Sequence, residues 1–230
     1  MLSDFPITQR WVPTNPSAIQ LYSMATPNGI KVSAMLEETG LDYEAHKVSI
    51  LEGDQMTPEF LSLNPNNKIP AIIDPSGPGG QPMGLWETGA ILMYLAEKTG
   101  RLLPTDPVKR AHAIQWLMWQ MGGAGPMFGQ FGFFFKMGGA AFEDKRPLER
   151  YSAETSRLLS VLDQQLSRNE YVAGDAMTIA DVATWPWVNV LSGFYGAADH
   201  LNLGQYAHLN RWLQGMLGRP ASQKAITVPA

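Results

Sequence analysis

Polar side chains stand between a short apolar run and a helical pattern in the stretch 21–40, LYSMATPNGIKVSAMLEETG. We expect a strand over Ile19–Ser23 and a helix over Ile30–Glu38 that ends at a glycine. The loop between them offers the Thr26 hydroxyl and the Asn28 amide, and it has no Cys, His, Asp or Glu. The amide cannot take up a proton at neutral pH, but both groups can donate hydrogen bonds to an anion. The residues alone leave two interpretations open: an anion-stabilising site and an ordinary turn, which the order Thr-Pro-Asn-Gly also favours.

A second feature is Pro70, which interrupts the strand that the pattern predicts over Lys68–Asp74. Because Pro lacks an N–H, it is tolerated in a strand in only a few situations. In one of them, Pro70 lies on an edge strand. In the other, the Ile69–Pro70 bond is cis, and the backbone N–H and C=O of Ile69 can pair with an extended peptide. The local sequence does not choose between the two.

Glu87 and Thr88 stand where a predicted strand turns into a helix over Glu87–Gly100. Backbone N–H groups at a helix start bind carboxylates, and the Thr88 hydroxyl adds another donor. The Glu87 carboxylate can receive an amine, so the pair suits an α-amino acid head group. Capping of the helix is the simpler alternative.

Strand and helix patterns alternate in the order β-α-β-α-β-β-α over residues 18–100, which predicts a mixed α/β domain. After an expected linker at 101–107 the strand signal disappears, and residues 108–230 show only helical patterns. We therefore expect an α/β domain followed by an all-α domain. Residues 1–17, which include three Pro, are expected to form an irregular arm.

The composition excludes several classes of function. Hydrophobic residues make up 45% of the 230 residues, and the net charge of −4 gives no attraction for nucleic acid or an anionic membrane. The absence of Cys excludes disulfides, thiolate metal sites and a protein thiol nucleophile, and the four His lack metal-ligand spacing. No signal peptide pattern and no apolar run near the ~20 residues of a membrane span is present. We expect a cytoplasmic protein with no bound metal, no nucleic acid partner and no membrane association.

A short motif in the expected helical domain adds to the two features around Pro70 and Glu87. Thr178–Asp181, TIAD, has the spacing of a capping box, a folding device for which we expect no catalytic role. Together with KIP at 68–70 and the pair Glu87–Thr88, it resembles the hallmarks of the glutathione transferases. That resemblance implies a thioredoxin-like N-terminal domain followed by a helical domain, and a homodimer.

Finer matches resemble the Nu class of this family, whose members act on glutathione disulfides and related molecules. The matching stretches are TPNG (26–29), NPNNKIPAI (64–72), GAILMYLAEKTG (89–100) and TIADVATWPW (178–187). The resemblance implies that Thr26 and Asn28 stabilise the thiolate of glutathione, the co-substrate. Hydrogen-bond donors and the start of the following helix can do this because the nucleophile belongs to glutathione itself. Ser23, at the strand end, is the main rival for this role.

The remaining contacts are implied by the same resemblance. Gln55 and Lys68 would meet the glycyl end of glutathione, Ile69 would pair through its backbone beside Pro70, and Glu87 with Thr88 would hold the γ-glutamyl end. Arg150 would come from the helical domain, of the same or the partner subunit. The aromatic stretch 125–139 suggests a loosely wound segment that forms a co-substrate pocket, with a core cluster as the alternative for most of its rings. The pocket residues are Phe128, Phe131, Phe134 and Phe135.

The function expected first is glutathione-dependent thiol–disulfide exchange, with weak transferase and peroxidase activity. Because the chain has no Cys, each active site must hold two glutathione molecules or one glutathione disulfide. One alternative is a conventional glutathione transferase or a conjugate lyase that acts on aromatic compounds. A second alternative is a non-catalytic glutathione-binding regulatory module on the same fold.

Overall fold

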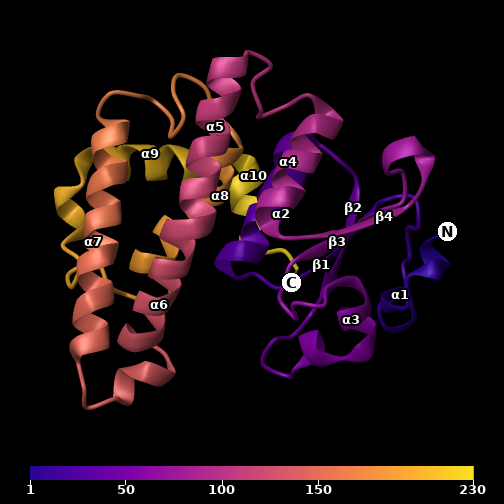
Figure 1. The fold of residues 1–230 in the computed structure, drawn as a ribbon, viewed down its shortest axis with the longest axis horizontal. Helices are drawn as coiled ribbons and strands as arrows, with labels where there is room; N and C mark the ends of the chain where they lie inside the picture. Colours follow the sequence, from indigo (N-terminus) through magenta and orange to yellow (C-terminus); the bar gives the residue numbers. More distant parts are fainter. Residues whose placement is uncertain (230) are drawn as a thin grey trace. The chain divides into compact units, whose positions relative to one another are not determined.

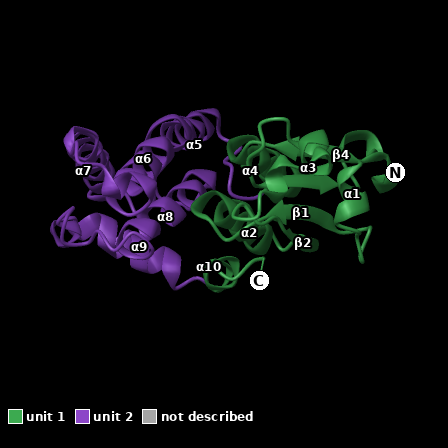
Figure 2. Ribbon diagram, turned by 90° about the horizontal axis from the view of Figure 1, so that it is seen from below, with its two compact units in different colours: residues 1–100, 220–230 green, residues 101–219 purple. Residues whose placement is uncertain are grey.

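The computed structural model describes residues 1–229 and divides the chain into two compact units (Figure 2). The sheet unit contains residues 1–100 and the chain from Pro220 onward. The helical unit contains residues 101–219. The sequence predicted the first domain over residues 18–100, and the C-terminal segment was expected in the helical domain.

The sheet unit is built on four strands in the order β2-β1-β3-β4 (Figure 1). β1 pairs parallel with β2, and β3 pairs antiparallel with both β1 and β4. The expected β-α-β-α-β-β-α order is confirmed, with two further short helices, α1 and α10. The strands are β1 (Ile19–Ser23), β2 (Tyr43–Lys47), β3 (Ala71–Asp74) and β4 (Met83–Trp86). The helices are α1 (Ile7–Arg10), α2 (Pro27–Thr39), α3 (Pro58–Leu63), α4 (Thr88–Thr99) and α10 (Pro220–Ala225).

One face of the sheet is covered by the N-terminal residues together with α3. Ile7 of α1 is completely buried in a cluster with Tyr22, Phe60 and Leu63, and Trp11 packs against the same cluster. The expected irregular arm therefore contains a short helix and forms part of the core. The apolar side chains of this arm cover the sheet. The helical stretch is too short for its periodicity to be recognised from sequence.

The C-terminal helix α10 packs on α2. Lys224 Nζ lies 2.8 Å from Glu37 Oε1, and Ser33 Oγ donates to the carbonyl of Val228 at 3.5 Å. The chain leaves the helical unit at Pro220, which cannot continue the preceding helix. These contacts are why the last residues belong to the sheet unit and correct the expected boundary.

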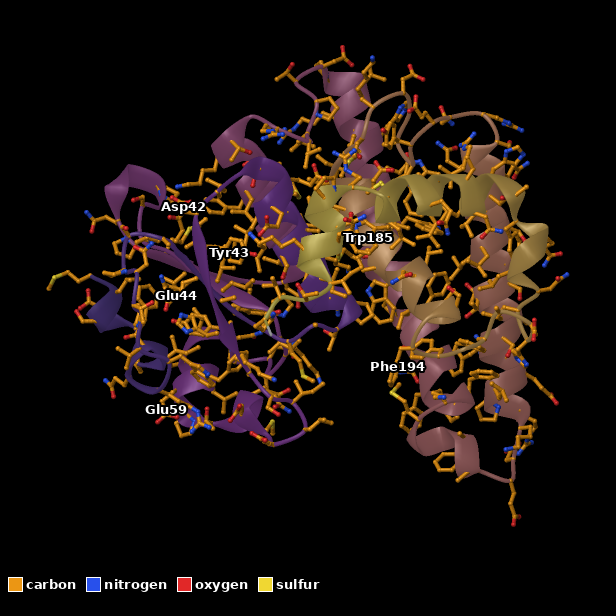
Figure 3. The ribbon with its side chains drawn as sticks, turned by 180° about the vertical axis from the view of Figure 1, so that it is seen from behind. Asp42, Tyr43, Glu44, Glu59, Trp185 and Phe194 are labelled. Atoms are coloured by element: carbon orange, nitrogen blue, oxygen red, sulfur yellow. The ribbon has the colours of Figure 1, made fainter. Side chains whose placement is uncertain are left out.

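The helical unit consists of five long helices around a buried core. Trp185 lies within this core, whereas Phe194 projects from the surface (Figure 3). The capping box is confirmed: Thr178 Oγ1 accepts from the backbone of α8, and the Asp181 carboxylate accepts from Thr178 N at 2.9 Å. Asp181 also accepts from Trp212 Nε1. The helices are α5 (Pro107–Trp119), α6 (Gly125–Phe135), α7 (Arg146–Leu166), α8 (Ile179–Ser192) and α9 (Ala207–Leu217).

The glycine-rich aromatic stretch is helical rather than loosely wound. A single π-helical turn at Gln120–Ala124 joins α5 to α6. The glycines allow close packing, because a Cβ on Gly132 would lie 2.0 Å from the ring of Tyr195. A Cβ on Gly129 would lie 3.3 Å from the ring of Trp187. The expectation of a loosely wound segment was therefore wrong for Gly125–Phe135.

No helix within residues 1–229 is long and apolar enough to cross a membrane. Across the same residues, no group of three or more His, Asp or Glu side chains could hold a metal ion.

Candidate functional site

Two cavities that share three lining residues occupy the sheet unit. The larger, about 350 Å³, is lined by Thr26, Asn28, Ile50, Gln55, Asn67, Lys68 and Ile69. The smaller, about 130 Å³, is lined by Asn28, Asn64, Asn66, Lys68, Ile69, Pro70, Glu87 and Thr88. The structure therefore brings together all eight site residues predicted in this unit. Asn28, Lys68 and Ile69 contribute to both cavities.

Thr26 and Asn28 lie at the start of α2. Thr26 caps this helix, and its Oγ1 accepts from the backbone N–H of Gly29 at 3.3 Å. Accepting this bond leaves the hydroxyl proton able to donate. Gly29 allows the close approach, since a Cβ there would lie 1.9 Å from the Met24 carbonyl oxygen. The hydroxyl, the Asn28 amide and the N-terminus of a 13-residue helix thus converge on one cavity, an arrangement that favours an anion.

Ser23 and Tyr22 take no part in either cavity. The Ser23 side chain is completely buried, and its Oγ donates to the carbonyl of Met24 at 3.4 Å. Tyr22 is also buried and stacks on His46 with ring centroids 4.8 Å apart. Burial raises the pKa of the Tyr22 hydroxyl. Both residues therefore have the surroundings of core residues.

The Ile69–Pro70 peptide bond is cis, which decides between the two situations that the sequence left open. The turn before it is held by Asn64, whose Nδ2 donates to the carbonyl of Lys68 at 2.6 Å. Asn64 Oδ1 accepts from the N–H of Asn66 at 2.9 Å. Sequence analysis did not single out Asn64, although the run Asn-Pro-Asn-Asn carries the turn signal that could have identified it.

Glu87 has the backbone conformation φ +69°, ψ +113° and directly precedes α4. A non-glycine residue at positive φ costs on the order of 1–3 kcal/mol, and such residues gather at ligand sites. The Glu87 side chain makes no capping hydrogen bond to α4, which weakens the capping alternative. Thr88 is the first residue of the helix and is buried.

Lys31 is a charged residue of this region that sequence analysis missed. It projects from α2, is 2% exposed, and its Nζ lies 3.5 Å from Thr88 Oγ1. Burial lowers the pKa of Lys31 to about 7, and the Glu87 carboxylate opposes part of that shift. The available signal was a lysine between Ile30 and Val32, in a helix that has no other charged residue before Glu37.

The other predicted site residues belong to the helical unit. Phe128 and Phe131 are completely buried, and Phe131 stacks on Phe135 with ring centroids 5.1 Å apart. Phe134 and Phe135 are half-buried, and Phe134 stacks on Tyr151. The core alternative therefore fits Phe128 and Phe131, and the assignment of Phe134 and Phe135 to a co-substrate pocket stays a prediction. Arg150 is exposed on α7.

Comparison with known proteins identifies the family. The model of the glutathione S-transferase N-terminal domain matches residues 17–97, and that of the C-terminal domain matches residues 125–220. The chain belongs to the glutathione S-transferase family. The resemblance and the fold of a thioredoxin-like domain with a helical domain, predicted from sequence, are therefore confirmed.

Relatives and solved structures of the family are similar over most of the chain. The Escherichia coli disulfide-bond oxidoreductase YfcG is 44% identical over 90% of this chain and 94% of its own. A second Escherichia coli disulfide-bond oxidoreductase, YghU, is 42% identical over 95% of this chain and 77% of its own. A Pseudomonas putida glutathione transferase, with one glutathione disulfide bound per subunit, has a TM-score of 0.98 and 54% identity over 100% and 99% of the chains. One from Burkholderia graminis, with two glutathione molecules per subunit, has a TM-score of 0.97 and 56% identity over 100% and 95%.

Proposed function

We propose that this protein is a Nu-class glutathione transferase that reduces disulfides with glutathione, with weak transferase and peroxidase activity, as a cytoplasmic homodimer. The observation that carries the proposal is the convergence of Thr26, Asn28, Lys68 and the pair Glu87–Thr88 on two cavities in a chain that has no Cys. The names of YfcG and YghU, and the glutathione or glutathione disulfide held by the solved relatives, support it.

In this proposal the smaller cavity receives the γ-glutamyl end of glutathione. The Glu87 carboxylate receives the amine, and Thr88 with the start of α4 receives the carboxylate. Ile69 beside Pro70 pairs through its backbone with the cysteinyl residue of the ligand. The larger cavity receives the glycyl end on Gln55 and Lys68, and the sulfur lies against Thr26 and Asn28. Arg150, from the same or the partner subunit, contributes a further contact to glutathione, and the half-buried Phe134 and Phe135 serve the second substrate.

The chemistry consists of two thiol–disulfide exchanges. The thiol proton of glutathione passes to solvent, and the thiolate attacks one sulfur of the substrate disulfide in line. The S–S bond breaks, a mixed disulfide forms, and the departing thiolate takes up a proton. A second glutathione thiolate then attacks the mixed disulfide, which releases glutathione disulfide and the second substrate thiol. The protein contributes proximity and stabilisation of the thiolate.

Bound glutathione is expected to have a thiol pKa below the roughly 8.5 of a free thiol. The Thr26 hydroxyl, the Asn28 amide and the start of α2 all favour the thiolate. Thiolate absorbance of the complex, recorded during a pH titration, measures this pKa. A value unchanged from that of glutathione in solution would contradict the roles of Thr26 and Asn28.

Turnover of a small model disulfide is expected to proceed without a covalent protein adduct, because the chain has no Cys that could form one. Mass spectrometry of enzyme quenched during turnover should show only the unmodified mass. Calorimetry should show two glutathione molecules or one glutathione disulfide per site. Saturation at one glutathione per subunit, together with no reductase activity, would instead favour a conventional transferase or conjugate lyase.

A further inference from the structure

The loop that carries Gln55 is organised around the carboxylate and backbone of Asp54. Asp54 Oδ2 accepts from the N–H of Ser49 at 2.9 Å, and the Asp54 N–H donates to the carbonyl of Ser49 at 3.1 Å. Its own carbonyl accepts from Thr57 Oγ1 at 2.8 Å. Gln55 follows directly, and both Ile50 and Gln55 line the larger cavity. Any movement of Asp54 therefore moves a wall of that cavity.

Arg10, the last residue of α1, holds this loop from outside. Its Nη2 donates to Asp54 Oδ1 at 2.5 Å, across 44 positions of sequence. The same guanidinium lies 5.0 Å from the ring centroid of Trp11. Trp11 Nε1 in turn donates to the carbonyl of Lys47, the last residue of β2, at 2.9 Å. Arg10 and the following Trp11 thus contact Asp54 and Lys47, the residues on either side of the loop 48–53.

The N-terminal segment is itself firmly anchored, so it can act as a fixed support. Ile7, a residue of this segment, is completely buried in the core cluster of the sheet unit. After Arg10 in the sequence, the backbone N–H groups of Thr14 and Asn15 donate to the Glu44 carboxylate at 2.7–3.0 Å. Glu44 projects from β2 (Figure 3). Backbone N–H donation to this carboxylate, chiefly from Asn15 and Thr14, outweighs desolvation and lowers its pKa, so it remains ionised and keeps these bonds at neutral pH.

Gln55 shows a sign of an unfilled ligand contact. Its Oε1 is buried and has no hydrogen-bond partner within residues 1–229. A buried acceptor without a donor is unfavourable, and an amide N–H of a peptide ligand in the cavity would satisfy it.

We propose that Arg10 is a positioning residue of the glutathione site, which fixes the Asp54 loop so that Gln55 meets the glycyl end of the peptide. This inference rests on the proposed function, because it takes glutathione as the occupant of the larger cavity. It gives residues 1–17 a role in substrate affinity in addition to covering the sheet. Arg10 acts through Asp54 and does not itself line either cavity.

The test measures dissociation constants by calorimetry for two peptides, glutathione and γ-glutamylcysteine, which lacks the glycyl end. Arg10→Met should raise the Kd of glutathione about fivefold, the effect of losing one partly exposed ion pair. The Kd of γ-glutamylcysteine should not change. Arg10→Lys, which keeps the charge, should restore part of the affinity. An equal loss for both peptides would mean a general structural effect and would overturn the proposal.

Lys224→Met is the matched control. It removes the ion pair with Glu37, which also lies in the sheet unit. The exposed fractions are similar in the two pairs: 62% for Lys224 and 15% for Glu37, and 44% for Arg10 and 13% for Asp54. We expect this variant to bind glutathione as the unmodified protein does, and equal weakening in both variants would overturn the proposal.

Gln55→Ala separates failure of this inference from failure of the proposed function. It should weaken glutathione binding, and adding Arg10→Met should weaken it little further, since both act on one contact. If Gln55→Ala has no effect, the proposed contact with the glycyl end is wrong. If Gln55→Ala weakens binding and Arg10→Met does not, or if the two effects add, the role of Arg10 is wrong.

Discussion

Replacement of Asn28 by alanine is expected to lower the rate of disulfide reduction by about 10²- to 10³-fold, the usual loss for one preorganised donor to an anion. Asn28 lines both cavities at the start of α2. Its amide NH₂ is a donor that solvent cannot replace with the same geometry. The measurement is kcat/KM with a small model disulfide at saturating glutathione.

The control is Ser23→Ala, which removes the hydroxyl that is the rival candidate. Ser23 Oγ is buried and donates to the carbonyl of Met24, so its loss should change the rate far less. Asn28→Asp supplies an independent readout, because it keeps the shape and replaces the donor with a negative charge. That charge should raise the thiol pKa of bound glutathione. A larger rate loss for Ser23→Ala than for Asn28→Ala would assign the thiolate to Ser23.

The part of the site that sequence analysis found lies on short stretches with strong local signals. The turn at Thr26–Gly29 and the strand-to-helix junction at Glu87–Thr88 each pair a backbone feature with a polar side chain. Because each stretch flanks a strand of one small sheet, the fold brings them together without any long loop. The family resemblance supplied the chemistry that these turns alone could not, since each also had a purely structural interpretation.

Two of the residues that sequence analysis did not single out, Lys31 and Arg10, depend on contacts between distant positions. Lys31 meets Thr88 across 57 positions, and Arg10 meets Asp54 across 44. No local pattern encodes such a pair. The glycines of α6 illustrate the same limit, because glycine reads as a chain breaker whereas Gly132 serves close packing against Tyr195. Burial of a charge and the approach of a ring are both properties of the folded chain.

Lys31 leads to a prediction about stability and pH. Its pKa is about 7 in the folded protein, against the 10.5 of an ordinary lysine. Between these values the unfolded chain binds a proton at this site and the folded chain does not, so the free energy of unfolding rises with pH. Equivalently, the stability contributed by neutral Lys31 is complete above about pH 10.5 and is lost as the pH falls to about 7. The contribution between pH 7 and pH 9 should be about 2 kcal/mol.

The variant Lys31→Met keeps most of the length of the side chain and removes its titration. We expect the difference in unfolding free energy, unmodified protein minus variant, to increase by about 2 kcal/mol from pH 7 to pH 9. Denaturant unfolding at several pH values measures it, and taking the difference cancels other groups that titrate in this range. Arg10→Met, which removes an exposed cation, should show no such trend. A difference that stays constant with pH would mean that Lys31 remains charged in the folded protein, with its cost met by the Glu87 carboxylate and the Thr88 hydroxyl.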